Sequence, residues 1–392
     1  MVVLRRPKIS FNSNLLLAIA ALTLVYFTFF WQIGTLVPGM SGPEAQTKII
    51  SQSLHSIQHN PANGLHAVLL YLINKAGLTT IAGARLVSAA LATIFTFCFY
   101  KVTKTWFGSF IAWASTALFA MTPLLILSAR SITPEIMYLM PLAVGATYFW
   151  LTKGEKPSTL AYVSLIIVGA LSLYTPGMVW LIIIGLVAIR SRIKPIYRSF
   201  PRRVTALGLI LALLIIAPLV VEVAKSFSLA RELLLIPSSF HALTLLKDIG
   251  WAGLAIFWHS QSHNTLQVGR LPLINATQIA FTVFGAYALW LRARNKTYGF
   301  IAVIVFGVLG VGLSGDYGLL LLPLISTSIL CAAGLRYLYI EWQGIFPRNP
   351  LPRVFAIVLL YTLVAININY GLHYSLAAWP HTVATKSTYV IK

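Results

Sequence analysis

The sequence predicts an all-α fold, a polytopic helical membrane protein with about eleven transmembrane helices and two long extracytoplasmic segments. Hydrophobic residues make up 58% of its 392 residues and charged residues only 9%, whereas about a quarter of the residues of a soluble domain are charged. Apolar stretches of roughly 18 to 22 residues recur along the chain, and each can cross a bilayer core as a helix. These observations exclude an ordinary soluble domain.

The basic residues lie in short clusters between the apolar stretches. The net charge of +21 could suggest a nucleic-acid partner, but such clusters are typical of the cytoplasmic loops of membrane proteins. We therefore expect no nucleic acid as a partner. The only two cysteines, Cys98 and Cys331, lie within apolar stretches, which favours packing roles over a disulfide or a metal site.

The first span, at residues 14–36, follows Arg5, Arg6 and Lys8, which we place in the cytoplasm together with the amino terminus. It is too long for the apolar core of a signal peptide, so we expect it to remain uncleaved. With this orientation most lysines and arginines lie inside, whereas six of the eight acids and all eight histidines lie outside. The other ten spans are expected at residues 81–100, 107–127, 136–152, 158–174, 177–189, 204–222, 272–291, 298–313, 317–338 and 353–371.

These spans predict a single integral membrane domain, residues 1–392, with two halves. The first half, 1–202, contains a first outer loop at 37–80, and the second half, 203–392, contains a second outer segment at 223–271. We therefore expect the functional polar residues, and the active face, on the extracytoplasmic side of the cytoplasmic membrane.

The first outer loop contains a pattern typical of a helix start. Ser41 can cap a helix that begins at Pro43, a residue suited to the first helical turn. Glu44 and Lys48 then lie four residues apart on one face. This segment is either an interfacial amphipathic helix, whose Glu44 favours the helix start and pairs with Lys48, or the carrier of a functional carboxylate.

Two further outer positions combine charge with turn residues. Arg130 and Glu135 lie five apart in the turn before the fourth span, where Thr133 and Pro134 can cap and start a helix around Glu135. A lone arginine at this level also contacts lipid phosphate readily. Arg85, at the outer start of the second span, fits either a snorkelling interfacial residue or an anion-binding one.

Other polar residues give weaker signals. His259 and His263 have a four-residue spacing that could bind a metal on a helix, but a solvated loop fits them better. Asp316 lies between glycine and tyrosine, which favours a turn. Glu222 and Glu232, near Lys225 and Arg231, are expected at a solvated edge of the second outer segment.

The order of short motifs in the first half resembles that of a known family. The family is the bacterial relatives of protein O-mannosyltransferases and lipid A aminoarabinose transferases, which are GT-C membrane glycosyltransferases, and the resemblance covers about residues 14–200. The matching residues are Glu44-Ala45, Arg85-Leu86, Ser88-Ala89, Phe107-Gly108, Thr122-Pro123, Arg130 and Pro134-Glu135.

The resemblance implies a GT-C-like fold with its catalytic half in residues 1–202. It also implies inverting transfer of a sugar from a polyprenyl-phosphate donor to a protein, lipid or glycan hydroxyl outside the cell membrane. Glu44 would be the catalytic base, and Arg85, Arg130 and Lys48 would bind the donor phosphate. Glu135 would be a second acid that orients the site or holds a divalent cation, and a groove between spans would hold the isoprenoid among the membrane lipids.

The sequence departs from the family at three positions. The family has an aspartate, usually the base, where this chain has Pro43. Its later aspartate is Glu135 here, and the arginine of its late Arg-Tyr pair is Asp316. Either Glu44 has taken over as base or the chain is an inactive factor in envelope-glycan assembly. A lipid-carrier flippase or transporter is the other alternative, although no acid lies clearly in the middle of a span.

Overall fold

The computed structural model describes residues 13–153, 157–237, 241–259, 265–268 and 270–391. Within these residues the protein is 80% helical and has no strand, only one isolated β-bridge between Met40 and Ile391. The predicted all-α fold is confirmed. Both cysteines are free, as expected from their positions in apolar stretches.

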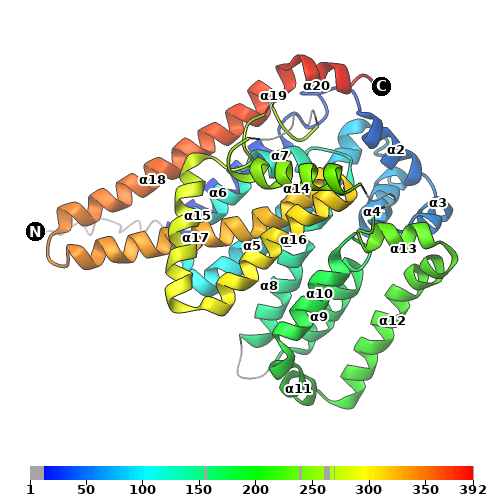
Figure 1. Ribbon diagram of the computed structural model, residues 1–392, viewed down its shortest axis with the longest axis horizontal. Coiled ribbons are helices and arrows are strands. Elements are labelled where there is room, and N and C mark those ends of the chain that lie inside the picture. Colours follow the sequence, from blue (N-terminus) through cyan, green and yellow to red (C-terminus); the bar gives the residue numbers. More distant parts are fainter. Residues whose placement is uncertain (1–12, 154–156, 238–240, 260–264, 269, 392) are drawn as a thin grey trace, which may run out of the picture.

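Each of the eleven predicted spans coincides with a helix or with a pair of consecutive helices (Figure 1). Five of the described helices are long and apolar enough to cross a membrane alone, or six if one bent pair counts as a span. The others are shorter apolar helices. The elements in chain order are α1 (Ser13–Val25) with η1 (Tyr26–Phe30), α5 (Ile81–Phe107), α6 (Ser109–Ala120) with α7 (Pro123–Ala129), η2 (Pro134–Leu139) with α8 (Met140–Thr152), α9 (Thr159–Ser172), α10 (Met178–Ala188), α12 (Arg202–Lys225), α15 (Ala276–Arg292), α16 (Arg294–Ser314), η3 (Tyr317–Leu320) with α17 (Leu321–Ile345), and α18 (Pro350–Leu372).

The third predicted span is a bent pair rather than one straight helix. The axes of α6 and α7 differ by 67°. Pro123 is the first residue of α7 and has no N–H to continue the hydrogen-bond pattern of α6, and Thr122 before it has extended backbone angles. The break directs α7 to the end of the first span, where the site is built.

Short helices fill the segments between the spans. The first outer loop contains α2 (Gly42–Ile50), α3 (Leu54–His59) and α4 (Gly64–Lys75), and Figure 1 shows them together with α13 (Phe227–Leu233) at one end of the molecule. The other short helices are α11 (Arg190–Arg198), α14 (Ala242–Phe257), η4 (His373–Ala378), α19 (Trp379–His381) and α20 (Val383–Thr388).

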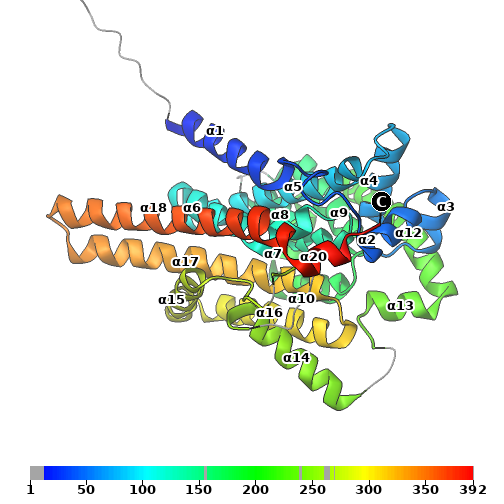
Figure 2. The ribbon, with the colours of Figure 1, turned by 90° about the horizontal axis from the view of Figure 1, so that it is seen from above.

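Helix α17 lies at the centre of the bundle. Every residue from Leu321 to Leu335 is buried, and Figure 2 shows α17 between α18 and α15. Helix α15 crosses α17 at two glycines. A Cβ atom on Gly285 would lie 1.8 Å from the carbonyl oxygen of Leu330, and one on Gly334 would lie 1.9 Å from that of Phe281. The backbones therefore touch without intervening side chains, as small residues allow between membrane helices.

We predict that Gly334→Ala destabilises the protein by about 1–3 kcal/mol, because the added methyl group has to separate α15 from α17. Thermal unfolding in detergent measures the change. Gly299→Ala is the matched control, since this glycine is also helical and its Cβ would meet nothing within 4 Å. A Gly334→Ala variant that unfolds at the same temperature as Gly299→Ala would show that the helices do not cross so closely.

Candidate active site

The start of α2 is held by two reciprocal hydrogen bonds. The Ser41 hydroxyl accepts from the Glu44 N–H, and the Glu44 Oε2 atom accepts from the Ser41 N–H at 3.1 Å. Pro43 lies in the first turn, as predicted. This capping box fixes the orientation of the Glu44 carboxylate at the place where the chain leaves the first span.

The Glu44 carboxylate forms a buried ion pair with Arg85 of α5. The Nε and Nη2 atoms of Arg85 lie 3.3 and 3.1 Å from the two carboxylate oxygens, and the side chains are 3% and 0% exposed. The other N–H groups of the guanidinium donate to the carbonyls of Ile33, Val37 and Gly39. Arg85 is thus fully occupied by the protein, and it does not offer the phosphate contact that the resemblance implied.

Glu44 has further partners on the loop after α7. Its Oε1 atom accepts from the Ile132 N–H at 2.9 Å and from the Ser131 hydroxyl at 3.4 Å. No part of the side chain is exposed, so this geometry favours a structural role for Glu44 over the predicted role as base. Lys48 does not pair with Glu44, because its ammonium group donates to the Thr79 carbonyl at 3.1 Å.

Arg130 binds the end of the first span. Its guanidinium donates to the carbonyls of Thr28, Trp31 and Gln32 at 2.8 to 3.3 Å. These carbonyls lie where the helix ends, and a cation there stabilises the helix terminus. Burial, with the charge of Arg85 nearby, lowers the pKa of Arg130 to about 10, so the guanidinium remains charged at neutral pH.

The carboxyl tail covers this ion pair. Met40 and Ile391 exchange two backbone hydrogen bonds, of 2.7 and 3.2 Å, and the Tyr389 ring lies 5.8 Å from the Arg85 guanidinium. Gly39 is required at the contact, because a Cβ atom there would lie 2.0 Å from the Tyr389 carbonyl oxygen. Figure 2 shows the end of the chain beside α2.

Glu135 differs from Glu44 in having an unpaired oxygen. Its Oε2 atom is buried and has no hydrogen-bond partner. Thr133 precedes η2 but does not cap it through its side chain, contrary to the sequence prediction. Burial and the negative charge of Asp316 raise the pKa of Glu135 to about 7.

One connected network joins Glu44 to the loop that carries Glu135. The Ser131 hydroxyl lies 2.5 Å from the Thr133 hydroxyl and also contacts Glu44, so hydroxyl groups link Glu44 to Thr133, two residues before Glu135. The rigid ion pair of Glu44 and Arg85 therefore fixes the loop that carries Glu135.

Glu135 lines a cavity of about 220 Å³ at the predicted outer end of the spans. Pro43 and Asp316 line the same cavity. Gly318 leaves room for Glu135, since a Cβ atom there would lie 2.5 Å from its Cγ atom. Glu135 thus faces the place where the resembled family has its aspartate.

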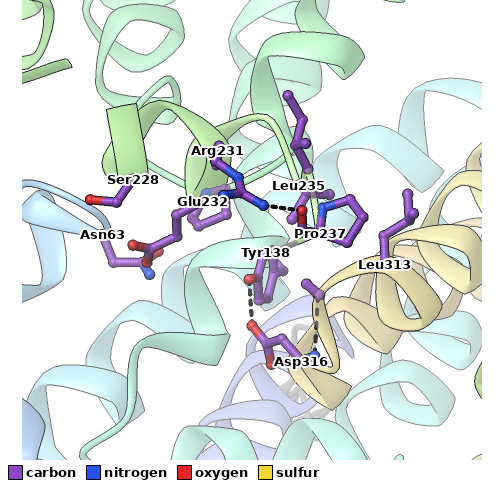
Figure 3. A pocket seen from close by; sticks show the side chains of 12 residues that line it. Asn63, Tyr138, Ser228, Arg231, Glu232, Leu235, Pro237, Leu313 and Asp316 are labelled. Carbon is purple, nitrogen blue, oxygen red and sulfur yellow. Dashed lines mark hydrogen bonds between the residues drawn. The ribbon is translucent and has the colours of Figure 1, made fainter. Parts of the chain in front are cut away.

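A second cavity, of about 420 Å³, shares Asp316 with the first (Figure 3). The Asp316 carboxylate accepts from the Tyr138 hydroxyl at 2.6 Å and from the Gly318 N–H at 2.8 Å, which confirms the predicted turn. Arg231 and Glu232 also line this cavity, and Glu232 is exposed, as expected for a solvated edge, whereas Glu222 of the same predicted edge is buried. Partial burial and the charge of Asp316 raise the pKa of Glu232.

A long apolar groove lies elsewhere among the spans. Its volume is about 950 Å³, and residues of α1, α5, α6 and α18 line it. Val25 and Ala120 line the groove towards the outer ends of α1 and α6, whereas Tyr100 and Lys104 line it near the predicted cytoplasmic end of α5. Thr28, whose carbonyl Arg130 binds, follows Val25 by less than one helical turn.

The described residues contain no group of three or more His, Cys, Asp or Glu side chains that could hold a metal ion. Glu135 has acidic neighbours but lacks such a set, so we derive no step through a metal. His263, part of the histidine pair considered above, lies outside the described residues.

Comparison with known proteins supports the fold. The chain is similar to the crystal structure of ArnT, a lipid A aminoarabinose transferase, from Cupriavidus metallidurans bound to undecaprenyl phosphate, with a TM-score of 0.54 and 14% identity. It is equally similar to the apo state of that protein, at 15% identity, and each match covers 96% of this chain and 77% of the other. No protein-family model matches the chain, and a search of curated proteins found no match. The predicted GT-C-like membrane fold is therefore confirmed.

We predict that Arg85→Met destabilises the protein by about 3–5 kcal/mol, because it leaves the buried Glu44 carboxylate and three carbonyls without their donor. Thermal unfolding in detergent measures the loss. Arg348→Met, which removes an exposed arginine from the loop before α18, should have little effect. Equal unfolding temperatures for the two variants would contradict the structural role of the ion pair.

Proposed function

We propose that the chain transfers a sugar from a polyprenyl-phosphate donor to an acceptor hydroxyl on the extracytoplasmic face of the cytoplasmic membrane, with inversion. The observation that carries this proposal is the Glu135 carboxyl group, which has one oxygen without a partner in an outer cavity of a GT-C-like fold. An acceptor hydroxyl entering the cavity would supply the missing partner. The pKa of Glu135, about 7, suits a general base at neutral pH.

In this mechanism Glu135 accepts the proton of the acceptor hydroxyl as that oxygen attacks the anomeric carbon of the sugar. The bond between the anomeric carbon and the phosphate oxygen breaks, and polyprenyl phosphate leaves with the electron pair. Attack from the face opposite the phosphate inverts the anomeric centre. Asp316, on the same cavity, keeps the pKa of Glu135 high enough for it to hold the proton after transfer.

Glu44 supports this base instead of acting as one. The family resemblance assigned the base to Glu44, but its carboxylate is buried and bound by Arg85, Ser131 and Ile132. The hydroxyl network through Ser131 then positions the loop that carries Glu135 across the cavity from Pro43. The base would thus have moved from one wall of the cavity to the other.

The apolar groove is the proposed place for the isoprenoid chain. Its volume and apolar lining suit a lipid tail, and the ArnT structure with undecaprenyl phosphate shows that this fold can bind such a lipid. Arg130 is charged and binds the carbonyl of Thr28, which follows the groove-lining Val25 by less than one helical turn. We place the donor phosphate near Arg130, where a cation would stabilise the leaving group.

A non-catalytic role in envelope-glycan assembly is the second candidate. Pro43 in place of the family's aspartate favours it, as does the full occupation of Arg85 by protein groups. An assembly factor of this kind would bind polyprenyl phosphate without releasing sugar from it.

We predict that Glu135→Gln lowers sugar transfer at least about 100-fold, because an amide cannot accept the proton. Release of undecaprenyl phosphate from a panel of undecaprenyl-phosphate sugars by the purified chain measures the rate. In the unmodified chain the rate should rise with pH through about 7, as the Glu135 carboxyl loses its proton, and then level off.

Glu341→Gln, a substitution on the predicted cytoplasmic side, is the control for this experiment and should keep full activity. Glu44→Gln should lower the unfolding temperature while retaining more activity than Glu135→Gln. If Glu44→Gln abolishes transfer in a folded protein and Glu135→Gln does not, the base is Glu44. Donor binding without any transfer by the unmodified chain would favour the assembly factor.

We also predict that Arg130→Gln raises the KM for the lipid donor by about tenfold or more, the cost of losing one charged hydrogen bond. Lys104→Gln, at the opposite end of the groove, should leave this KM unchanged. A raised KM in Lys104→Gln together with an unchanged KM in Arg130→Gln would place the donor phosphate at the opposite end of the groove. Arg130→Lys should recover part of the loss because it restores the charge.

A further inference from the structure

Two histidines on the first outer loop face each other outside the proposed active site. His55 and His59 lie four residues apart on α3, and their Nε2 atoms are 3.2 Å apart. The two rings meet edge to face, with centroids 4.4 Å apart. Both side chains are exposed to solvent at the outer face, so an ion can reach them.

A carboxylate from α12 lies beside the other nitrogen of His59. The Glu222 Oε2 atom is 3.7 Å from the His59 Nδ1 atom, and the Glu222 side chain is only 7% exposed. Lys225 holds the second oxygen of Glu222 at 2.8 Å. A negative charge at this position favours the hydrogen on Nδ1, which leaves the lone pair of Nε2 directed at His55.

The distance between the two Nε2 atoms fits a tetrahedral metal ion. Two metal–nitrogen bonds of about 2.0–2.1 Å at the tetrahedral angle place the nitrogens about 3.3–3.4 Å apart. Without a metal, one of the two imidazoles has to donate a hydrogen to the other. A cation between them would displace this hydrogen, which that imidazole then carries on its Nδ1 atom, so both rings stay neutral.

We propose that His55 and His59 bind a divalent transition-metal cation, for which Zn²⁺ is the best match. The two Nε2 atoms are the protein ligands, water fills the remaining positions, and Glu222 orients His59 as carboxylates commonly do for metal-bound imidazoles. Ca²⁺ and Mg²⁺ prefer oxygen ligands and do not fit this pair. The site is independent of the proposed sugar transfer, and it joins the first outer loop to the outer end of α12.

Titration calorimetry with Zn²⁺ on the purified full-length chain, without a polyhistidine tag, tests the proposal. The measurement uses a His259→Ala background, which removes the other pair of histidines with a four-residue spacing. We expect one bound Zn²⁺ per chain and no heat with Mg²⁺. His55→Ala and His59→Ala should each lower the affinity at least tenfold, and Glu222→Gln should lower it about tenfold.

His381→Ala is the matched control, because this outer-face histidine has no histidine four residues away and should not affect binding. The variants at positions 55 and 59 should unfold at the same temperature as the background protein without Zn²⁺, since both side chains are exposed. Absence of Zn²⁺ binding in the background protein would overturn the proposal. Equal Zn²⁺ affinity in the His59→Ala variant would also overturn it.

Discussion

The buried ion pair between Glu44 and Arg85 is the interaction on which the outer face depends. Two charges removed from water are stable only when every remaining donor and acceptor is satisfied. Arg85 meets this condition by binding the carbonyls of the chain leaving the first span, and Glu44 meets it through the start of α2 and the loop after α7. Three segments that are distant in the sequence are thereby held at one point.

This arrangement separates the charges that build the site from those available for chemistry. The guanidinium of Arg85 has all its N–H groups bound by Glu44 and backbone carbonyls, whereas that of Arg130 binds the end of the first span and is also the cation proposed for the donor phosphate. Among the described residues, the cavity-lining acids Glu135 and Asp316 form no ion pair like that of Glu44 with Arg85. Burial, with the charge of Asp316 nearby, raises the pKa of Glu135 to about 7.

Local patterns in the sequence were sufficient for the helices. Hydropathy located a helix or helix pair at each of the eleven predicted positions, and the serine and proline before Glu44 correctly located the start of α2. The site was harder to predict, because the partners of Arg85 and Arg130 are mainly backbone carbonyls, which have no sequence signal. The approach of Asp316 to Glu135 depends on how η3 packs against η2, which no local pattern in the sequence reveals. In the sequence, a polar residue between two spans has the same pattern around it whether its side chain faces solvent or a cavity.

The pairing of Met40 with Ile391 has a consequence for biogenesis. Membrane proteins are inserted from the amino terminus during synthesis, and domains generally acquire structure in that order. The loop around Glu44 leaves the ribosome early, but Tyr389 and Ile391, which cover it, are made hundreds of residues later. The outer face can therefore reach its final form only after the last span is in place, so a prematurely terminated chain would expose an unfinished site to quality control.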